Sequence, residues 1–291
     1  MLGVIGGSGV YQLEGLARAR WERVASPFGA PSDEILLGEL AGQPMAFLPR
    51  HGRGHRTPPS GINYRANIDA LKRVGVTDLL SLSAVGSLRE DLAPGTFVIV
   101  DQFVDRTTGR ERTFFDRGVV AHVPLARPVC GRIGDALESS ARALGLPHRR
   151  GGTSLVIEGP QFSTVAESEL YRQWGCDVIG MTSLPEARLA REAELCYATV
   201  AMVTDYDCWH PAHDSVTVPE VMAVMQANSS KAAALLRQVA PGLAAHPSPC
   251  PHGCDRVLDV AIVTALEARD PETVRRLDAV AGRILTVKSE E

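Results

Sequence analysis

The chain has 291 residues, of which 45% are hydrophobic and 22% charged, and its net charge is -4. This length allows one large α/β domain or two small ones with a well-buried core. The mild acidity argues against a nucleic-acid surface, which usually carries a basic stripe, and no run reaches the roughly 18 apolar residues of a membrane helix. The N-terminal sequence MLGVIGG enters a predicted strand without the basic region of a secretory signal, so we expect a cytoplasmic protein.

Short apolar runs alternate with helical patterns along the chain, which predicts an α/β fold in one domain. The predicted strands are 2–5, 34–38, 44–48, 78–83, 96–101, 153–157, 177–180 and 196–203. The predicted helices are 62–74, 129–144, 164–175, 185–194 and 217–238. Gly75 follows the first helix, where a C-terminal cap is expected.

The segment 241–254 is rich in proline, glycine and cysteine, and it is the only plausible boundary in the sequence. We therefore predict an α/β domain over residues 1–240. Residues 241–291 are predicted to form a C-terminal extension that packs on the same domain or on a neighbouring subunit.

The six cysteines are too few and too scattered for a disulfide framework. Cys176 and Cys196 lie in apolar segments and are expected in the core. The sequence HPSPCPHGC contains groups that could hold a metal or close a small disulfide, namely His246, Cys250, His252 and Cys254. Their spacing is not that of a familiar zinc motif and there is no second cysteine pair, so we predict a surface loop and no metal.

Two aspartates, Asp205 and Asp207, follow the apolar run 196–203 in the sequence TDYDCW. The end of a buried strand is where open α/β sheets bind their ligands. A carboxylate there can accept a hydrogen bond from an amino group or share a proton with a ring nitrogen. Taken alone, the pair is more typical of a cap or a solvated turn.

Two further strand ends near the N-terminus carry groups that bind anions. GGSG (6–9) is a Gly-rich turn whose N–H groups, with the Ser8 hydroxyl, can face phosphate. The dinucleotide and Walker fingerprints are both absent, which argues against an NAD-binding oxidoreductase. PRHGRGH (49–55) offers an arginine fork and a titratable donor in Arg50 and His51, although a solvated basic loop is an equal alternative for such a run.

Two more strand ends carry hydroxyl groups. SLSAVGS (81–87) places Ser83 at the tip of a strand, and GMTSLPE (180–186) places Thr182 at a helix N-terminus, where it could face an anion. The alternative is a plain helix cap by Ser183 or Thr182. Each signal is weak alone. Four strand ends with anion donors, together with a carboxylate pair at a fifth, indicate a site for phosphate and an amino-bearing heterocycle.

The motifs occur in an order and at spacings that resemble the 5′-methylthioadenosine phosphorylase branch of the purine nucleoside phosphorylase family. The resemblance covers roughly residues 1 to 235, in the sequences GGSG, PRHGRGH, NYRANI, SAVGSLRE, DQFVDRT, IEGPQFS, GMTSLPEA and TDYDCW. It implies a single α/β domain around a mixed, barrel-like sheet and a homotrimer. It also implies no metal or organic cofactor, cleavage of purine nucleosides by inorganic phosphate, and a role in purine and methionine salvage.

The resemblance also implies roles for individual residues. The phosphate ligands would be Ser8, Arg50, His51, Ser83, Ala84 and Thr182. Serine stands at 8 and 83 where relatives often carry threonine, and the hydroxyl survives both changes. The nucleoside would contact Phe162, Ser163, Met181, Asp205, Asp207, Val218, Val221 and Met222, the last three at helical spacing with Met225. His122 would reach into a neighbouring subunit's site.

The implied reaction forms a free purine and a 5-substituted ribose 1-phosphate, with inversion at C1′. Asp205 would act as the acid that protonates the base at N7, which requires a raised pKa, and Asp207 would accept from the exocyclic amino group or orient Asp205. Relatives that act on 6-oxopurines usually carry Glu at the position of Ser163 and Asn at that of Asp205. The residues present here match a 6-aminopurine better.

Three alternatives remain open at this point. The chain could be a phosphorylase for 5′-methylthioinosine or other 6-oxopurine nucleosides, or one for another 5′-modified adenosine such as a 5′-halogenated one. It could also be a non-catalytic protein that binds nucleosides or phosphate.

Overall fold

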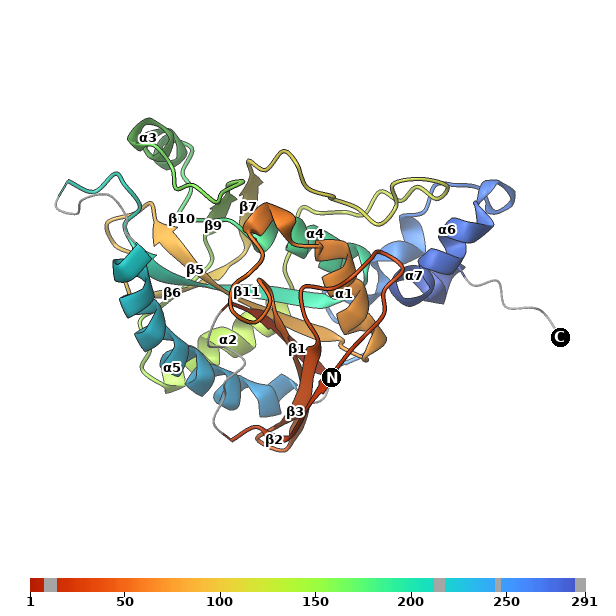
Figure 1. Cartoon of the computed structure of the whole chain (residues 1–291), viewed down its shortest axis with the longest axis horizontal. Helices are drawn as coiled ribbons and strands as arrows, with labels where there is room; N and C mark the ends of the chain where they lie inside the picture. The colour runs from red at the N-terminus through yellow and green to blue at the C-terminus, as the bar shows by residue number, and fades with distance from the viewer. Residues whose placement is uncertain (8–14, 212–217, 244–246, 286–291) are drawn as a thin grey trace.

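The computed structural model describes residues 1–7, 15–211, 218–243 and 247–285. Within these ranges, a mixed β-sheet of eleven strands lies at the centre and helices cover both of its faces (Figure 1). The strands are β1 (Leu2–Gly6), β2 (Ala17–Glu22), β3 (Ile35–Leu40), β4 (Gln43–Pro49), β5 (Asp78–Ser87), β6 (Phe97–Val100), β7 (Gln102–Asp105), β8 (His148–Arg150), β9 (Thr153–Val156), β10 (Val178–Gly180) and β11 (Cys196–Asp205). The α-helices are α1 (Tyr64–Arg73), α2 (Gly131–Ala143), α3 (Val165–Gln173), α4 (Ser183–Glu192), α5 (Val218–Leu243), α6 (Pro271–Arg276) and α7 (Asp278–Leu285). The predicted α/β fold with a central mixed sheet is confirmed.

The long strand β5 organises the sheet, because three other strands pair with it. The main path runs β2-β3-β4-β1-β5-β10-β9-β7, and β11 also pairs with β5 and leads on to β6 and β8. β1 and β11 run parallel to β5, whereas β10 runs antiparallel to its last residues. The sheet therefore branches at β5, as expected of a barrel-like sheet rather than an open one.

The register of the parallel strands brings their carboxyl ends to one place. Gly6 at the end of β1 lies opposite Pro49 at the end of β4 and opposite Leu82 in β5. Val200 in β11 also lies opposite Leu82, so β11 and β5 continue past this level together. The segments that follow β1 and β4 and the later halves of β5 and β11 thus meet at the same edge, which is where the sequence places its polar motifs.

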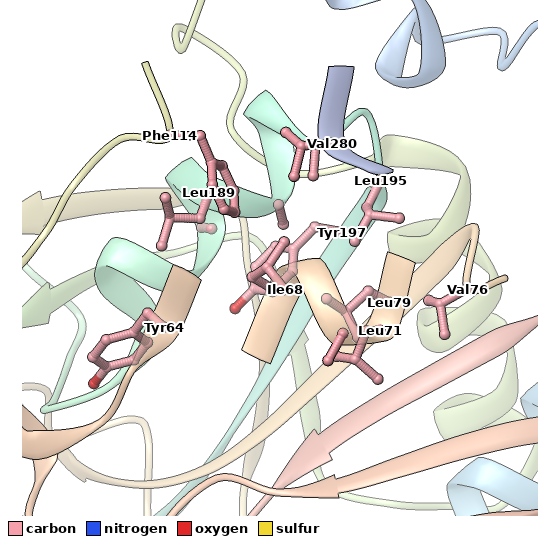
Figure 2. Close-up of a cluster of buried hydrophobic side chains, with 14 of the residues drawn as sticks. Tyr64, Ile68, Leu71, Val76, Leu79, Phe114, Leu189, Leu195, Tyr197 and Val280 are labelled. Atoms are coloured by element: carbon pink, nitrogen blue, oxygen red, sulfur yellow. The ribbon is translucent and has the colours of Figure 1, made fainter. Parts of the chain in front are cut away.

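Successive residues of each strand point to opposite faces of the sheet, so their side chains pack into two separate hydrophobic layers. Leu79 of β5 and Tyr197 of β11 belong to the layer formed with α1, α4 and α7, which Figure 2 shows in close-up. Leu80 and Ala198, the next residue along each strand, belong to the layer formed with α2 and α5 on the other face. The period of two in these runs fixes which face each side chain occupies.

The C-terminal residues 247–285 pack against these same two layers. Leu258 and Val280 are buried in the layer with α1 and α4, where Figure 2 labels Val280. Cys250 and Cys254 are buried in the layer with α2 and α5. The interpretation of 241–254 as a surface loop is therefore wrong for its two cysteines. The division of the chain at residue 240 stays a prediction.

Three strands escaped the sequence analysis: β2, β7 and β8. β2 has the sequence ARARWE and is almost fully exposed, and β8 has the sequence HRR, so neither carries the apolar run that identifies a buried strand. Both pair with a single neighbour at a margin of the sheet, where backbone hydrogen bonds are enough to form a strand.

Gly75 follows the end of α1 with φ +89°, as predicted for a C-terminal cap. No helix among the described residues is long and apolar enough to cross a membrane.

Candidate functional site

A cavity of about 300 Å³ opens at the edge where the parallel strands end, and its volume is at the lower end of the range for small-molecule sites. It brings together almost all of the residues singled out from the sequence. Those that line it are Arg50, His51, Ser83, Ala84, Phe162, Ser163, Met181, Thr182, Asp205, Asp207, Val218, Val221 and Met222. Ser8 lies outside the described residues, although its neighbour Gly7 lines the cavity.

Arg50 lies in the wall of the cavity and is fully buried. Its Nε donates to Glu186 Oε2 at 2.9 Å, its Nη1 to the Leu82 carbonyl at 3.1 Å, and its Nη2 to Ser81 Oγ at 2.7 Å. The middle of β5 and the first turn of α4 therefore hold the guanidinium in one orientation. A rigid cation of this kind is suited to a phosphate group, because little side-chain entropy is lost on binding.

His51 is neutral in this environment. Burial lowers the pKa of its imidazole to about 4, and the nearby Arg50 charge acts in the same direction. Its Nδ1 lies 2.8 Å from the Thr57 carbonyl oxygen, which can only accept, so Nδ1 carries the proton. The His55 ring stacks on it at 4.1 Å between centroids and fixes the ring plane.

Two hydroxyl groups complete the polar end of the cavity. Ser83 Oγ and Thr182 Oγ1 are 3.4 Å apart and both side chains are buried. Thr182 occupies the N-cap position of α4, yet its side chain makes no capping hydrogen bond. The alternative of a simple helix cap is thus wrong for Thr182, and its hydroxyl faces the cavity instead.

The two aspartates lie together at the end of β11. Asp205 Oδ2 accepts from Thr204 Oγ1 at 2.7 Å, and Asp205 Oδ1 accepts from the Asp207 backbone N–H at 2.8 Å. Asp207 adopts φ +53°, a left-handed conformation that is uncommon outside glycine, asparagine and aspartate. Gly86 lies against the pair, and a Cβ atom at that position would be 2.9 Å from Asp205 Oδ1.

The pKa of the Asp207 carboxyl is raised, first because it is buried and also because Asp205 is nearby. A raised carboxyl pKa is typical of a group that exchanges a proton at a functional site. The sequence led us to expect this property at Asp205, where it stays a prediction.

The loops before α3 and α4 supply the next part of the lining. Phe162 is 46% exposed and its ring forms an open side of the cavity. Ser163 Oγ is buried and has no hydrogen-bond partner among the described residues, so it is available to a ligand. Met181 is held through its carbonyl by Arg110 Nη1 at 2.6 Å.

The start of α5 closes the cavity with an apolar surface. Val221, Met222 and Met225 line it from one face of the helix, together with the terminal Val218. Val218 and Met222 are 63% and 50% exposed. Large apolar side chains with this exposure indicate a surface that a ligand or a partner covers.

His122 does not line the cavity. Its backbone N–H donates to the Ala261 carbonyl at 2.8 Å, next to the isolated bridge between Ala121 and Ile262. The structure contains one chain, so a contribution of His122 to a neighbouring subunit stays a prediction.

Several residues of the site were not singled out from the sequence. His55 stands in the same motif as His51, and Thr204 directly precedes Asp205, so both had a positional signal. Arg110 had none, because its partners are distant in sequence. They are the backbone carbonyls of Met181, Leu184 and Glu158, the Glu158 carboxylate and the Tyr64 hydroxyl. A network of this kind becomes visible only once the chain is folded.

Known proteins share this fold and sequence over almost the whole chain. S-methyl-5′-thioadenosine phosphorylase of Rhodospirillum rubrum is 62% identical over 285 residues, covering 98% of this chain and 97% of its own. The enzyme of the same name from Geobacter sulfurreducens is 50% identical over 283 residues, covering 97% of this chain and 98% of its own.

Solved structures agree with the sequence comparisons. A methylthioadenosine phosphorylase from an antarctic soil metagenomic library superimposes with a TM-score of 0.88 at 46% identity, covering 96% of this chain and 98% of that one. Methylthioadenosine phosphorylase from Schistosoma mansoni in complex with adenine gives a TM-score of 0.82 at 35% identity, covering 92% and 98%. A sequence model described as the phosphorylase superfamily matches residues 1–241. Sequence, fold and the lining of the cavity lead to one conclusion: this chain belongs to the phosphorylase superfamily.

Proposed function

We propose that this protein catalyses the phosphorolysis of S-methyl-5′-thioadenosine to adenine and 5-methylthioribose 1-phosphate. One observation carries the proposal: a single cavity combines a buried arginine, two hydroxyl groups, a carboxylate pair and an apolar wall. The arginine and the hydroxyls suit a phosphate, the carboxylates suit an aminopurine, and the apolar wall suits a 5′-methylthio group. The reaction needs no cofactor, because inorganic phosphate is itself a substrate.

The first task of the site is to hold phosphate against C1′ of the nucleoside. Arg50 supplies a fixed positive charge, and Ser83 and Thr182 supply hydroxyl donors 3.4 Å apart. A phosphate oxygen then forms the new bond to C1′ while the bond from C1′ to N9 breaks, with inversion at C1′. Because binding has already brought the two reactants together, their loss of translational and rotational entropy no longer adds to the barrier of the chemical step.

The second task is to make the purine a better leaving group. The electron pair of the broken bond enters the ring, and a proton at N7 neutralises it. Asp205 is the group we assign to this proton transfer, with Asp207 accepting from the exocyclic amino group. The raised pKa of Asp207 supports an assignment in which the pair holds one proton between its two carboxyls.

The 5′ substituent faces an apolar surface in this assignment. Val218, Val221 and Met222 offer no hydrogen-bond partner to a 5′-hydroxyl but pack well against a methylthio group. Burying an unpaired hydroxyl there costs on the order of 1–3 kcal/mol. The wall therefore favours 5′-methylthioadenosine over adenosine.

The proposal also covers assembly and location. We place the protein in a homotrimer in the cytoplasm, with His122 completing the site of a neighbouring subunit. The exposed side chains of Val218 and Met222 support the idea that another chain or a ligand covers this region.

The test is a comparison of four nucleosides with purified protein and phosphate: 5′-methylthioadenosine, 5′-methylthioinosine, adenosine and inosine. We expect release of free base that depends on phosphate, with the highest kcat/KM for 5′-methylthioadenosine. Faster turnover of the 6-oxopurines would overturn the substrate assignment. Nucleoside binding without phosphate-dependent release of base would overturn the catalytic function altogether.

A further inference from the structure

Four of the six cysteines converge in the hydrophobic layer between the sheet and α2. Their Sγ atoms all lie within 4.8 Å of one another, and the side chains belong to Cys130, Cys196, Cys250 and Cys254. All four are at most 3% exposed. The other two cysteines, Cys176 and Cys208, are not part of this group.

Three separate segments present these thiols. Cys130 is the N-cap residue of α2, and Cys196 is the first residue of β11. Cys250 and Cys254 flank a turn in the C-terminal segment, which the Gly253 N–H closes by donating to the Cys250 carbonyl at 2.8 Å. Gly253 adopts φ +66°, a conformation that glycine allows at little cost.

The geometry fits a tetrahedral metal. With metal–sulfur bonds of about 2.3 Å, the sulfur atoms of a tetrahedral zinc site lie about 3.8 Å apart. Cys130 Sγ and Cys250 Sγ are 3.8 Å apart, whereas a disulfide requires about 2.05 Å. We propose that Cys130, Cys196, Cys250 and Cys254 bind one Zn²⁺ ion in a structural site.

The spacing of the cysteines agrees with this assignment once the fold is known. Cys250 and Cys254 are separated by three residues, within the range of two to four that is common for paired zinc ligands. The second pair, Cys130 and Cys196, is separated by 66 positions and is formed only by the packing of α2 on β11. For this reason the sequence alone reveals no second pair of cysteines beside Cys250 and Cys254.

Two features beside the cluster suit a metal–thiolate site. Cys130 is the N-cap residue of α2, so the positive end of the helix dipole lies beside its sulfur atom. The side chain of Arg132, in the first turn of the same helix, pairs with Asp78 next to the cluster. Zn²⁺ with four thiolates carries a net charge of about −2, and a helix N-terminus beside the sulfur atoms offsets part of it.

The site would be structural, because it lies far from the cavity. Cys196 begins β11 and Asp205 ends it, so the two are separated by roughly 30 Å along the strand. A metal held there would fasten the C-terminal segment to β11 and α2. It would take no part in the phosphorolysis, and the inference is independent of the proposed function.

Metal content of the purified protein is the first test. Protein produced in zinc-supplemented medium and purified under reducing conditions should contain about one zinc per chain by elemental mass spectrometry. Cys250→Ser/Cys254→Ser should lose the zinc, whereas Cys176→Ser, a substitution of another buried cysteine outside the cluster, should retain it. Removing the zinc from the wild type with a chelator should lower its melting temperature by several degrees, and zinc should restore it.

Exchange of zinc for Co²⁺ tests the geometry even where the double variant fails to fold. Four thiolates should give the intense visible absorption and the ultraviolet charge-transfer band of tetrahedral cobalt. Wild-type protein without metal, in which mass spectrometry after alkylation finds the four cysteines of the cluster as free thiols or joined in two disulfides, would overturn the proposal. Metal bound equally well by wild type and double variant would overturn it too. Phosphorolysis by the zinc-free protein is measured separately, so that a failure of the zinc proposal can be told apart from a failure of the proposed enzymatic function.

Discussion

Arg50 and Glu186 form a two-point ion pair beneath the polar end of the cavity. Arg50 Nε lies 2.9 Å from Glu186 Oε2, and Nη2 lies 3.3 Å from Oε1. Both side chains are 2% exposed, and Tyr197 donates its hydroxyl to Glu186 Oε1 at 3.0 Å. The carboxylate orients the guanidinium and balances its charge. Arg50 is therefore a structural partner of Glu186 as well as a candidate phosphate ligand.

This double role decides which substitution tests Arg50. Alanine would leave the Glu186 carboxylate buried without its partner, at a cost of about 3–5 kcal/mol, so fold and function would fail together. Arg50→Lys keeps a positive charge but loses the planar fork. We expect the KM for phosphate to rise at least tenfold, with a smaller change in the KM for the nucleoside, because a charge-assisted two-point contact is lost.

Steady-state kinetics with each substrate varied in turn would measure this split. Arg142→Lys is a matched control, because Arg142 lies on the exposed side of α2 with its side chain 71% exposed. If Arg50→Lys had the same phosphate KM as the wild type, Arg50 would be a purely structural residue.

A second prediction concerns His51 and pH. In the unfolded chain its pKa is about 6.5, whereas burial lowers it to about 4 in the fold. Between these values the unfolded state binds more protons, so the free energy of unfolding falls as the pH falls from 6.5 to 4. The loss due to this one group should reach about 3 kcal/mol.

Chemical unfolding of the wild type and of His51→Gln at pH 7 and at pH 4.5 would isolate this contribution. We expect the wild type to lose more stability than the variant over this interval. Phosphate should reduce the difference, because an anion beside the ring favours the imidazolium. Parallel pH curves for the two proteins, with and without phosphate, would contradict the neutral buried state of His51.

The sequence allowed much of the site to be predicted because several of its residues lie in local motifs where strands end. Arg50 follows β4 and Asp205 ends β11, and both strands belong to the parallel part of the sheet, whose carboxyl ends meet at one edge. Ser83 and Thr182 are placed differently, because β5 continues past Ser83 to Ser87 and Thr182 follows β10, which runs antiparallel to β5. Strands such as β2 and β8, which lack an apolar run, were missed because pairing at a margin leaves no such mark on the sequence.

Contacts between distant segments could not be predicted in this way. Glu186 and Arg50 are separated by 136 positions, and most hydrogen bonds of Arg110 go to backbone carbonyls, which any residue can supply. The group of four cysteines is the clearest example, because Cys130 and Cys196 resemble ordinary core residues until Cys250 and Cys254 pack against them. Such groups depend on the relative position of whole elements, which a sequence pattern does not encode locally.

Gly86 allows a third prediction, which tests the position of Asp205 without altering its chemistry. A methyl group at Gly86 would lie 2.9 Å from Asp205 Oδ1 and 3.3 Å from Asp207 Cβ, closer than normal contacts allow. Gly86→Ala should therefore displace the carboxylate pair and lower kcat by about tenfold or more, since small misplacements at a reacting group are costly.

The matched control is Gly242→Ala, where no atom lies within 4 Å of the added methyl group. Both variants should fold, as judged by circular dichroism and thermal unfolding. Wild-type kcat in Gly86→Ala would show that Asp205 and Asp207 need no fixed position, and the assignment of the base-activating pair would have to change.

The fourth prediction concerns assembly. Analytical ultracentrifugation should find a homotrimer, and His122→Ala should raise the KM for the nucleoside. The substitution should leave the chain folded, since the contact that His122 makes with Ala261 uses its backbone N–H, which alanine retains. Arg20→Ala is a control, because its side chain is 68% exposed on β2. A fully active monomer would remove both parts of the prediction.

The sharpest prediction concerns Asp205. Asp205→Ala should lower kcat by a factor of about 10²–10⁴, the usual contribution of a positioned general acid. Asp205→Asn keeps the shape of the side chain, including an oxygen that can still accept from Thr204, but cannot give up a proton to the base. Its amide donor suits a 6-oxo group, so activity on 5′-methylthioadenosine should fall while activity on 5′-methylthioinosine rises relative to it.

Asp207→Asn is the informative comparison, because the raised pKa of Asp207 makes it the other candidate for the proton. If Asp207 only accepts from the amino group or orients its neighbour, Asp207→Asn should affect the nucleoside KM more than kcat. The kinetic constants of both variants on both nucleosides separate these roles. A wild-type kcat and an unchanged preference in Asp205→Asn, together with a collapse of kcat in Asp207→Asn, would transfer the acid role to Asp207. The bond network between the two residues would then serve to hold the proton on Asp207, with Asp205 as the charged partner that raises its pKa.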